Sequence, residues 1–147
     1  MSPRGPVLAL DYGTKRIGLA VSDSEGEFAF PVGELQRRNP KRDLEELAQL
    51  VRERGIVEIV VGLPLHLDGR AGAEAEAARD FAASVGSATG LPVELLDERW
   101  TSREAERALR ESQPRRRKRE RARLDAAAAA ILLRTFLAQR TADRNDS

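Results

Sequence analysis

Cysteine is missing from this chain of 147 residues, and histidine occurs only once. Without thiols the protein can form neither a disulfide nor a thiolate metal site, which is typical of proteins in a reducing cytosol. A single histidine also argues against a zinc site built from several imidazoles. Any metal ion bound here would therefore need oxygen ligands, and these are the ligands that Mg²⁺ and Mn²⁺ prefer.

Long apolar segments are missing as well. No run approaches the roughly 20 apolar residues that a membrane-spanning helix needs, so we expect no membrane partner. The length is sufficient for one domain with its own hydrophobic core. We expect this domain to cover residues 1–140 and to be followed by a polar tail at residues 141–147.

Charge is balanced in total but unevenly distributed. The formal net charge is +1, yet the segment PRRRKRERAR, residues 114–123, has seven basic residues and one acidic residue. A smaller basic group, RRNPKR, covers residues 37–42. Such clusters are typical of phosphate-binding surfaces, although a solvated loop can have the same composition. Because arginine has a planar fork that suits phosphate, we favour nucleic acid as the partner.

The segment VLALDYGTKRIGLAVSD, residues 7–23, predicts two strands joined by a short turn. Asp11 ends the first strand, and the turn with Gly13 follows it. Gly13 and Gly18 carry no side chain, so a phosphate backbone could approach closely. An aspartate in this place is also common as a simple turn residue, and the segment by itself slightly favours that role.

The remaining sequence predicts three more strands and four helices. Short connections join the first three strands, which predicts an antiparallel meander, whereas helical crossovers make strands one, four and five parallel. We therefore expect an α/β fold with a mixed five-stranded sheet of order 3-2-1-4-5 and helices on both faces. The expected strands cover residues 27–35, with Pro31 on an edge, 56–61 and 91–96; the expected helices run from Asn39–Pro40 to Gly55, from Ala73 to Val85, from Thr101 to about Gln113, and from Asp125 to Leu137.

Acidic residues occur at three points of this predicted fold: Asp11, Asp97 with Glu98, and Asp125. The strand order reverses beside strand one, so the first two points lie at the crevice where the parallel strands end. The last helix could bring Asp125 to the same place, although an aspartate before a helix is more often an N-cap. Converging carboxylates repel one another and need a cation, and two Mg²⁺ or Mn²⁺ ions about 3.5–4 Å apart can activate water against a phosphodiester. Strand alternation allows only one of Asp97 and Glu98 to face the crevice.

Four motifs in this order resemble the YqgF/RuvX family: LDYGTKRIGLAVSD, VVGLPLHLDG, DERWTS and LDAAAAAILL. These are RNase H-like nucleases related to Holliday junction resolvases of the RuvC type. The resemblance covers about residues 7–137 and implies an RNase H-like fold, divalent-metal cleavage of phosphodiesters and a place in the bacterial cytoplasm. By motif match, Asp11, Glu98 and Asp125 take the positions of the family's acidic residues. The chain departs from the family at His66, where asparagine is more usual, and in its arginine-rich basic segment.

The resemblance implies a substrate of two kinds. The family is linked to processing of the 5′ end of precursor 16S ribosomal RNA, and some members are described as junction resolvases, which cut branched DNA and need two symmetric active sites in a homodimer. A non-catalytic RNA-binding module is a further alternative, although intact carboxylates facing phosphates would not serve it. For Asp68 we prefer a turn role to a metal role. The candidate contacts to nucleic acid are Lys15, Arg16, Arg99, Arg115, Arg116, Arg117, Lys118 and Arg119.

Overall fold

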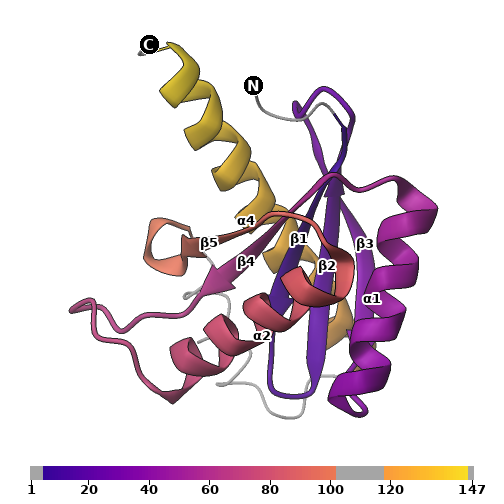
Figure 1. Ribbon diagram of the computed structural model, residues 1–147. Helices are drawn as coiled ribbons and strands as arrows, with labels where there is room; N and C mark the ends of the chain where they lie inside the picture. The colour runs from indigo at the N-terminus through magenta and orange to yellow at the C-terminus, as the bar shows by residue number, and fades with distance from the viewer. Residues whose placement is uncertain (1–4, 102–117, 146–147) are drawn as a thin grey trace.

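A computed structural model describes residues 5–101 and 118–145. Its centre is a five-stranded sheet of order β3-β2-β1-β4-β5, in which β1, β2 and β3 are antiparallel while β1, β4 and β5 are parallel (Figure 1). The predicted fold class and strand order are therefore confirmed. The strands are β1 Val7–Tyr12, β2 Arg16–Ser22, β3 Ala29–Gln36, β4 Glu58–Leu63 and β5 Val93–Asp97; the helices are α1 Pro40–Arg54, α2 Ala73–Thr89, the 3-10 helix η1 Glu98–Trp100 and α4 Lys118–Asn145.

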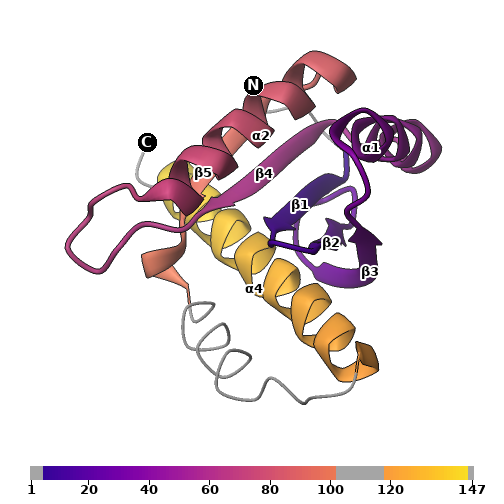
Figure 2. The same cartoon turned by 90° about the horizontal axis from the view of Figure 1, so that it is seen from below.

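The two faces of the sheet carry separate apolar clusters. On one face, Leu8, Leu10 and Val61 pack with residues of α1 and α2. On the other, Val7, Ala9 and Val60 pack with residues of α4. Strand side chains alternate between the faces, so the continuous apolar runs of β1 and β4 supply both clusters. Figure 2 shows α4 crossing one face while α1 and α2 lie on the other, as predicted.

Helix α4 lies close to the sheet because several side chains on the face that contacts the sheet are small. Ala128, Ala129 and Ala130 are buried together with Leu132 and Leu133. Near its far end, Arg140 donates through Nη2 to both carboxylate oxygens of Glu58 at 2.5 and 2.6 Å. The run of alanines thus forms a helix packed against the sheet, as the sequence predicts. No helix in the described part of the chain is long and apolar enough to cross a membrane.

The boundaries of α4 differ from the prediction. We expected a helix from Asp125 to Leu137, but the described helix runs from Lys118 to Asn145. Lysine, arginine, glutamate and alanine are strong helix formers, so the end of the basic segment continues the helix instead of preceding it. At the other end, the bond between Arg140 and Glu58 anchors the helix beyond Leu137. The helix expected from Thr101 to Gln113 falls almost entirely outside the described residues.

Short sequence signals determine where helix α1 begins and ends. The Asn39 side chain accepts a hydrogen bond from the backbone N–H of Arg42 at 2.9 Å, and Pro40 takes the first helical position. Gly55 ends the helix with φ of 64°, the left-handed conformation that favours glycine. Both ends of α1 are therefore where the sequence places them. Strands three to five begin and end one to two residues later than predicted.

Candidate active site

Asp11 lies near the end of β1 and is only 2% exposed. Strand alternation places it on the face of Val7 and Ala9, which is the face that α4 covers. A carboxylate buried to this degree loses most of its hydration, and that loss must be compensated by hydrogen bonds or cations. The burial favours a functional position for Asp11 over that of a plain solvated turn residue.

Glycines occupy the strand positions on both sides of Asp11. Gly18 in β2 is its cross-strand partner. In β4, Val61 pairs with Leu10, so Gly62 is the residue that comes next to Asp11. The register places both glycines on the α4 face, because Ala20 and Val60, two residues away from them, belong to the apolar cluster there. Neither neighbouring strand therefore contributes a side chain beside this carboxylate.

Glu98 follows β5 directly and is the first residue of η1. It is 3% exposed, and Leu96, two residues earlier, lies in the cluster on the α4 face. Its backbone is held by Thr101, whose N–H and Oγ1 donate to the Glu98 carbonyl at 3.0 and 2.9 Å. Glu98 and Asp11 are thus two buried carboxylates at the carboxyl ends of parallel strands of the same sheet.

Asp97 has a different role. Its carboxylate accepts hydrogen bonds from the backbone N–H of Arg99 at 2.9 Å and from the Arg99 guanidinium, where Nη2 is 2.6 Å from Oδ2. The side-chain hydrogen bond from Arg99 lowers the pKa of Asp97 and outweighs the effect of burial, which raises it. Arg99 also donates to the carbonyl of Leu67 at 3.4 Å. Through these contacts Asp97 holds the backbone on both sides of Glu98 in place.

Asp125 lies within α4, four residues before Ala129. Its side chain falls outside the part of the structure that is described, so its approach to Asp11 and Glu98 stays a prediction. Among the residues whose side chains are described, no group of three or more acidic or histidine residues is arranged to hold a metal ion. The buried carboxylates of Asp11 and Glu98 nevertheless offer the oxygen ligands that Mg²⁺ and Mn²⁺ prefer.

The predicted nucleic-acid contacts are placed unequally. Lys15 is exposed in the turn after β1. Arg16 begins β2 and is mostly buried, with its Nε 3.4 Å from Oε2 of Glu34. Arg99 is bound to Asp97, as described above. The remaining candidates are outside the described side chains: Arg115, Arg116, Arg117, Lys118 and Arg119.

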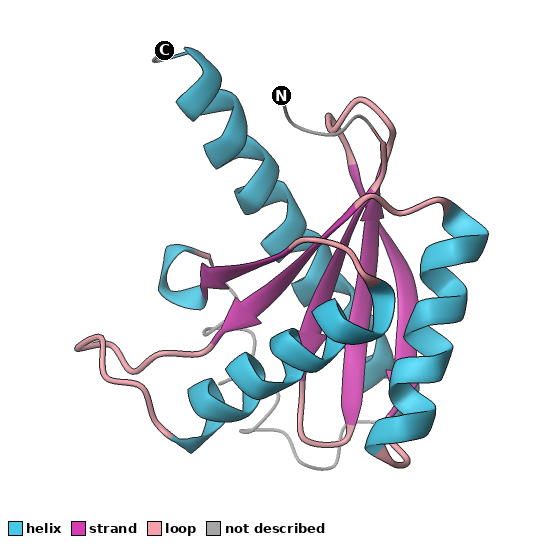
Figure 3. Ribbon diagram, viewed as in Figure 1, coloured by secondary structure: helices cyan, strands magenta, loops and turns pink. Residues whose placement is uncertain are grey.

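The loop of residues 64–72 leaves the sheet next to this site, and Figure 3 shows it extending beyond β4 before α2 begins. Asp68 accepts hydrogen bonds from the N–H and the Nε of Arg70 at 3.0 and 2.8 Å. His66 closes the same turn, since its N–H donates to the carbonyl of Arg70 at 2.9 Å. The predicted turn role of Asp68 is therefore confirmed.

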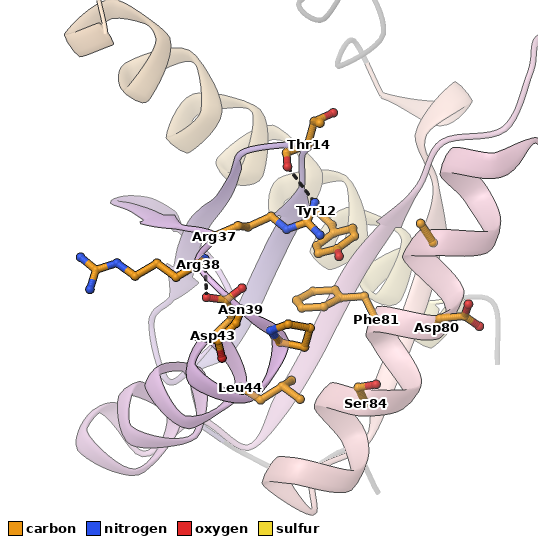
Figure 4. Close-up of a pocket in the computed structure, with 12 residues that line it drawn as sticks. Tyr12, Thr14, Arg37, Arg38, Asn39, Asp43, Leu44, Asp80, Phe81 and Ser84 are labelled. Atoms are coloured by element: carbon orange, nitrogen blue, oxygen red, sulfur yellow. Dashed lines mark hydrogen bonds between the residues drawn. The ribbon is translucent and has the colours of Figure 1, made fainter.

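A pocket of about 510 Å³ opens on the opposite face, between β1, α1 and α2 (Figure 4). Tyr12, Phe81 and Leu44 form its apolar part, and Arg37 and Asp80 are among its polar residues. Tyr12 follows Asp11 in β1 and therefore lies on the other face of the sheet. This pocket and the two buried carboxylates are separated by the sheet itself.

Arg37 is the residue whose place the sequence did not predict. It lies after β3, yet its side chain reaches the turn that follows Asp11 and donates to the Gly13 carbonyl at 2.8 Å. We expected residues 37–42 to form a basic surface for phosphate. The contact joins residues 24 positions apart, and no local pattern in the sequence indicates it.

Comparison with known proteins supplies the family. The RuvX family, described as Holliday junction resolvase, matches residues 5–139. A protein of Koribacter versatilis named "Putative pre-16S rRNA nuclease" is 46% identical over 142 residues, covering 97% of this chain and 92% of the relative. A protein of the same name from Chloroflexus aurantiacus is 41% identical over 143 residues, covering 96% and 92%.

Among solved structures, RuvC of Thermus thermophilus in complex with a Holliday junction substrate has a TM-score of 0.59. The alignment covers 93% of this chain and 96% of RuvC at 16% identity, which supports a shared fold. The family match spans most of the chain, and the relatives match it over nearly their whole length. The chain belongs to the RuvX family.

Proposed function

We propose that this protein is a divalent-metal-dependent nuclease that cleaves phosphodiester bonds at Asp11 and Glu98, within one domain covering residues 1–140. The observation that supports this most is the burial of these two carboxylates, 2% and 3% exposed, at the carboxyl ends of parallel strands. Carboxylates at such strand ends lie where ligands bind in α/β sheets. The names of the relatives point to the same activity.

The residues fit a magnesium or manganese site. Asp11 and Glu98 would hold the ions together with Asp125, because helical periodicity puts position 125 on the same side of a helix as positions 129 and 132. Bound ions would supply charge stabilisation and water activation for phosphodiester cleavage. Gly18 and Gly62 leave the positions beside Asp11 without side chains, so a phosphate group can come near that carboxylate.

The basic residues would bind the nucleic acid strand. Lys15 is exposed in the turn between β1 and β2, four residues after Asp11. Five basic residues precede Asp125 in the chain: Arg115, Arg116, Arg117, Lys118 and Arg119. Arginine and lysine at phosphates release counterions and provide affinity without regard to sequence. Arg16 and Arg99 have carboxylate partners, Glu34 and Asp97, so we expect them to contribute less.

The natural substrate in this proposal is precursor 16S ribosomal RNA, processed at its 5′ end in the cytoplasm. The names of the relatives favour it. Branched DNA is the second candidate, because the family is described as Holliday junction resolvase. The two differ in assembly: a resolvase needs two symmetric active sites and hence a homodimer, whereas an RNA end-processing nuclease can act as a monomer.

One comparison separates these substrates. The purified protein is given a 16S precursor fragment and a four-way DNA junction of equal concentration, each with Mg²⁺, with Mn²⁺ and with a chelator, while its mass is measured in solution. We expect metal-dependent cleavage of the RNA fragment at its 5′ side. Faster cleavage of the junction by a dimer would support the resolvase, and binding of RNA without cleavage in either metal would support the non-catalytic module.

A further inference from the structure

The turn between β1 and β2 is bound by Arg37, the residue that follows β3. The N–H of Arg37 donates to the carbonyl of Lys15 at 2.9 Å. Its Nη1 donates to the carbonyls of Gly13 and Thr14 at 2.8 and 2.9 Å. Arg37 thus binds three successive carbonyls, all those of the turn between β1 and β2. The backbone at this place cannot shift without breaking several of these bonds.

The same side chain also fixes the residue next to Asp11. The guanidinium of Arg37 lies over the Tyr12 ring, 4.3 Å from its centroid. On its other side, Tyr12 stacks on Phe81 of α2, with 4.1 Å between centroids and 15° between ring planes. Figure 4 shows Arg37, Tyr12 and Phe81 in this order, while Arg38 points away from them. The stack joins the end of β3, the end of β1 and α2.

We propose that Arg37 is a positioning residue for the site at Asp11. It acts from the α1–α2 face, whereas the carboxylate of Asp11 lies on the α4 face, so the effect passes through the backbone of Tyr12 and Gly13. The Nη1 and the backbone N–H of Arg37 donate to carbonyls of the turn, so we expect these donors to make no contact with a substrate phosphate. This inference rests on the proposed function, because it assigns to Arg37 the alignment of a carboxylate that serves cleavage.

The expected effect is on the rate of cleavage more than on affinity. A misplacement of about 1 Å in a catalytic group can cost on the order of 10²-fold in rate. Arg37→Ala should therefore lower the single-turnover rate at saturating RNA by about 10- to 100-fold. Its dissociation constant for the same RNA, measured in a chelator, should stay within about twofold, since no phosphate contact that releases counterions is lost.

Two further variants sharpen the test. Arg37→Lys keeps the positive charge but cannot bind two carbonyls and cover a ring at once, so we expect it to be slowed as well. Arg52→Ala removes an exposed arginine at the last turn of α1 and should keep the rate. Added methylguanidinium should restore part of the rate to Arg37→Ala and none to Arg37→Lys. Should Arg37→Ala fail to fold, Arg37→Lys carries the measurement.

Amide hydrogen exchange gives a second readout that does not depend on cleavage. Residues 13–16 should exchange faster in both Arg37 variants than in the wild type. A wild-type rate at saturation with unchanged exchange would overturn the proposal, as would a loss confined to affinity with a smaller salt dependence, which would make Arg37 a phosphate contact. If the wild type cleaves no nucleic acid, the proposed function fails, and rapid exchange in the variants would still show that Arg37 holds the turn.

Discussion

Asp97 and Arg99, the neighbours of Glu98 on either side, bind each other, with Nη2 of Arg99 2.6 Å from Oδ2 of Asp97. This pair links the residues on both sides of Glu98. A further hydrogen bond, from Arg99 to the carbonyl of Leu67, connects this segment to the loop after β4. Glu98 itself is 3% exposed. The two charged neighbours therefore serve to fix the backbone from which the buried carboxylate projects.

Asp97→Asn should lower stability in a pH-dependent way. The pKa of Asp97 is below its usual range because of the Arg99 side chain, so the charged form is the one that the fold stabilises. This contribution is complete above the unfolded pKa of about 3.9 and is lost as pH falls through the lower folded value. We expect the variant to lose roughly 1 kcal/mol at pH 7, since Arg99 remains partly exposed, 31%.

Urea unfolding of wild type and variant from pH 7 down to pH 3 checks this. The difference in the free energy of unfolding should be constant near neutrality and shrink on acidification. Asp68→Asn is the matched control, because the Asp68–Arg70 pair is mostly exposed, 57% and 75%, and should contribute little. A difference that grows on acidification would contradict the assignment.

Gly62→Ala tests the space beside Asp11. The added methyl group would stand on the α4 face at the strand position next to the carboxylate. We expect cleavage to fall by at least about tenfold, because the close approach of a phosphate or an ion is obstructed. Gly86→Ala in α2 is the control, since its Cβ would meet Val93 at an ordinary contact distance of 3.5 Å. Full cleavage by a folded Gly62→Ala protein would refute this role of the glycine.

If the basic segment, residues 114–123, contacts phosphates, its removal should change how nucleic-acid binding depends on salt concentration. Replacing Arg115, Arg116 and Arg117 together by alanine removes three charges that we expect at phosphates. The slope of log affinity against log salt should become shallower by roughly two to three, because each phosphate contact contributes about 0.7–0.9. Filter binding or fluorescence anisotropy across a salt series measures it. An unchanged slope would leave the segment as a solvated stretch of chain.

Local patterns in the sequence predicted the sheet and most of its helices. The apolar run of β4, the cap at Asn39 and the glycine at position 55 act over a few residues, so they can be recognised without knowing the fold. Asp11 and Glu98 could be proposed as site residues because the strand order places both at the carboxyl ends of parallel strands. Their burial, 2% and 3%, is a property of the packed molecule.

Contacts between distant parts of the chain could not be predicted in this way. The extension of α4 to Asn145 depends on packing and on the bond from Arg140 to Glu58, which lies 82 residues earlier. The hold of Arg37 on the turn at Gly13 likewise spans 24 residues. Arginine is equally suitable for phosphate, carboxylate and carbonyl, so its type alone does not reveal which partner it has.

The measurement that tests the central claim most directly is the cleavage rate of Asp11→Asn beside the wild type, with Mg²⁺ and with Mn²⁺. The substitution keeps the shape of the side chain and removes its charge. We expect the rate to fall by at least about 10²–10³-fold, the usual cost of a lost preorganised electrostatic contribution, while metal-free binding of RNA and the thermal midpoint are kept or raised. A folded Asp11→Asn protein that cuts at the wild-type rate would contradict the proposed active site.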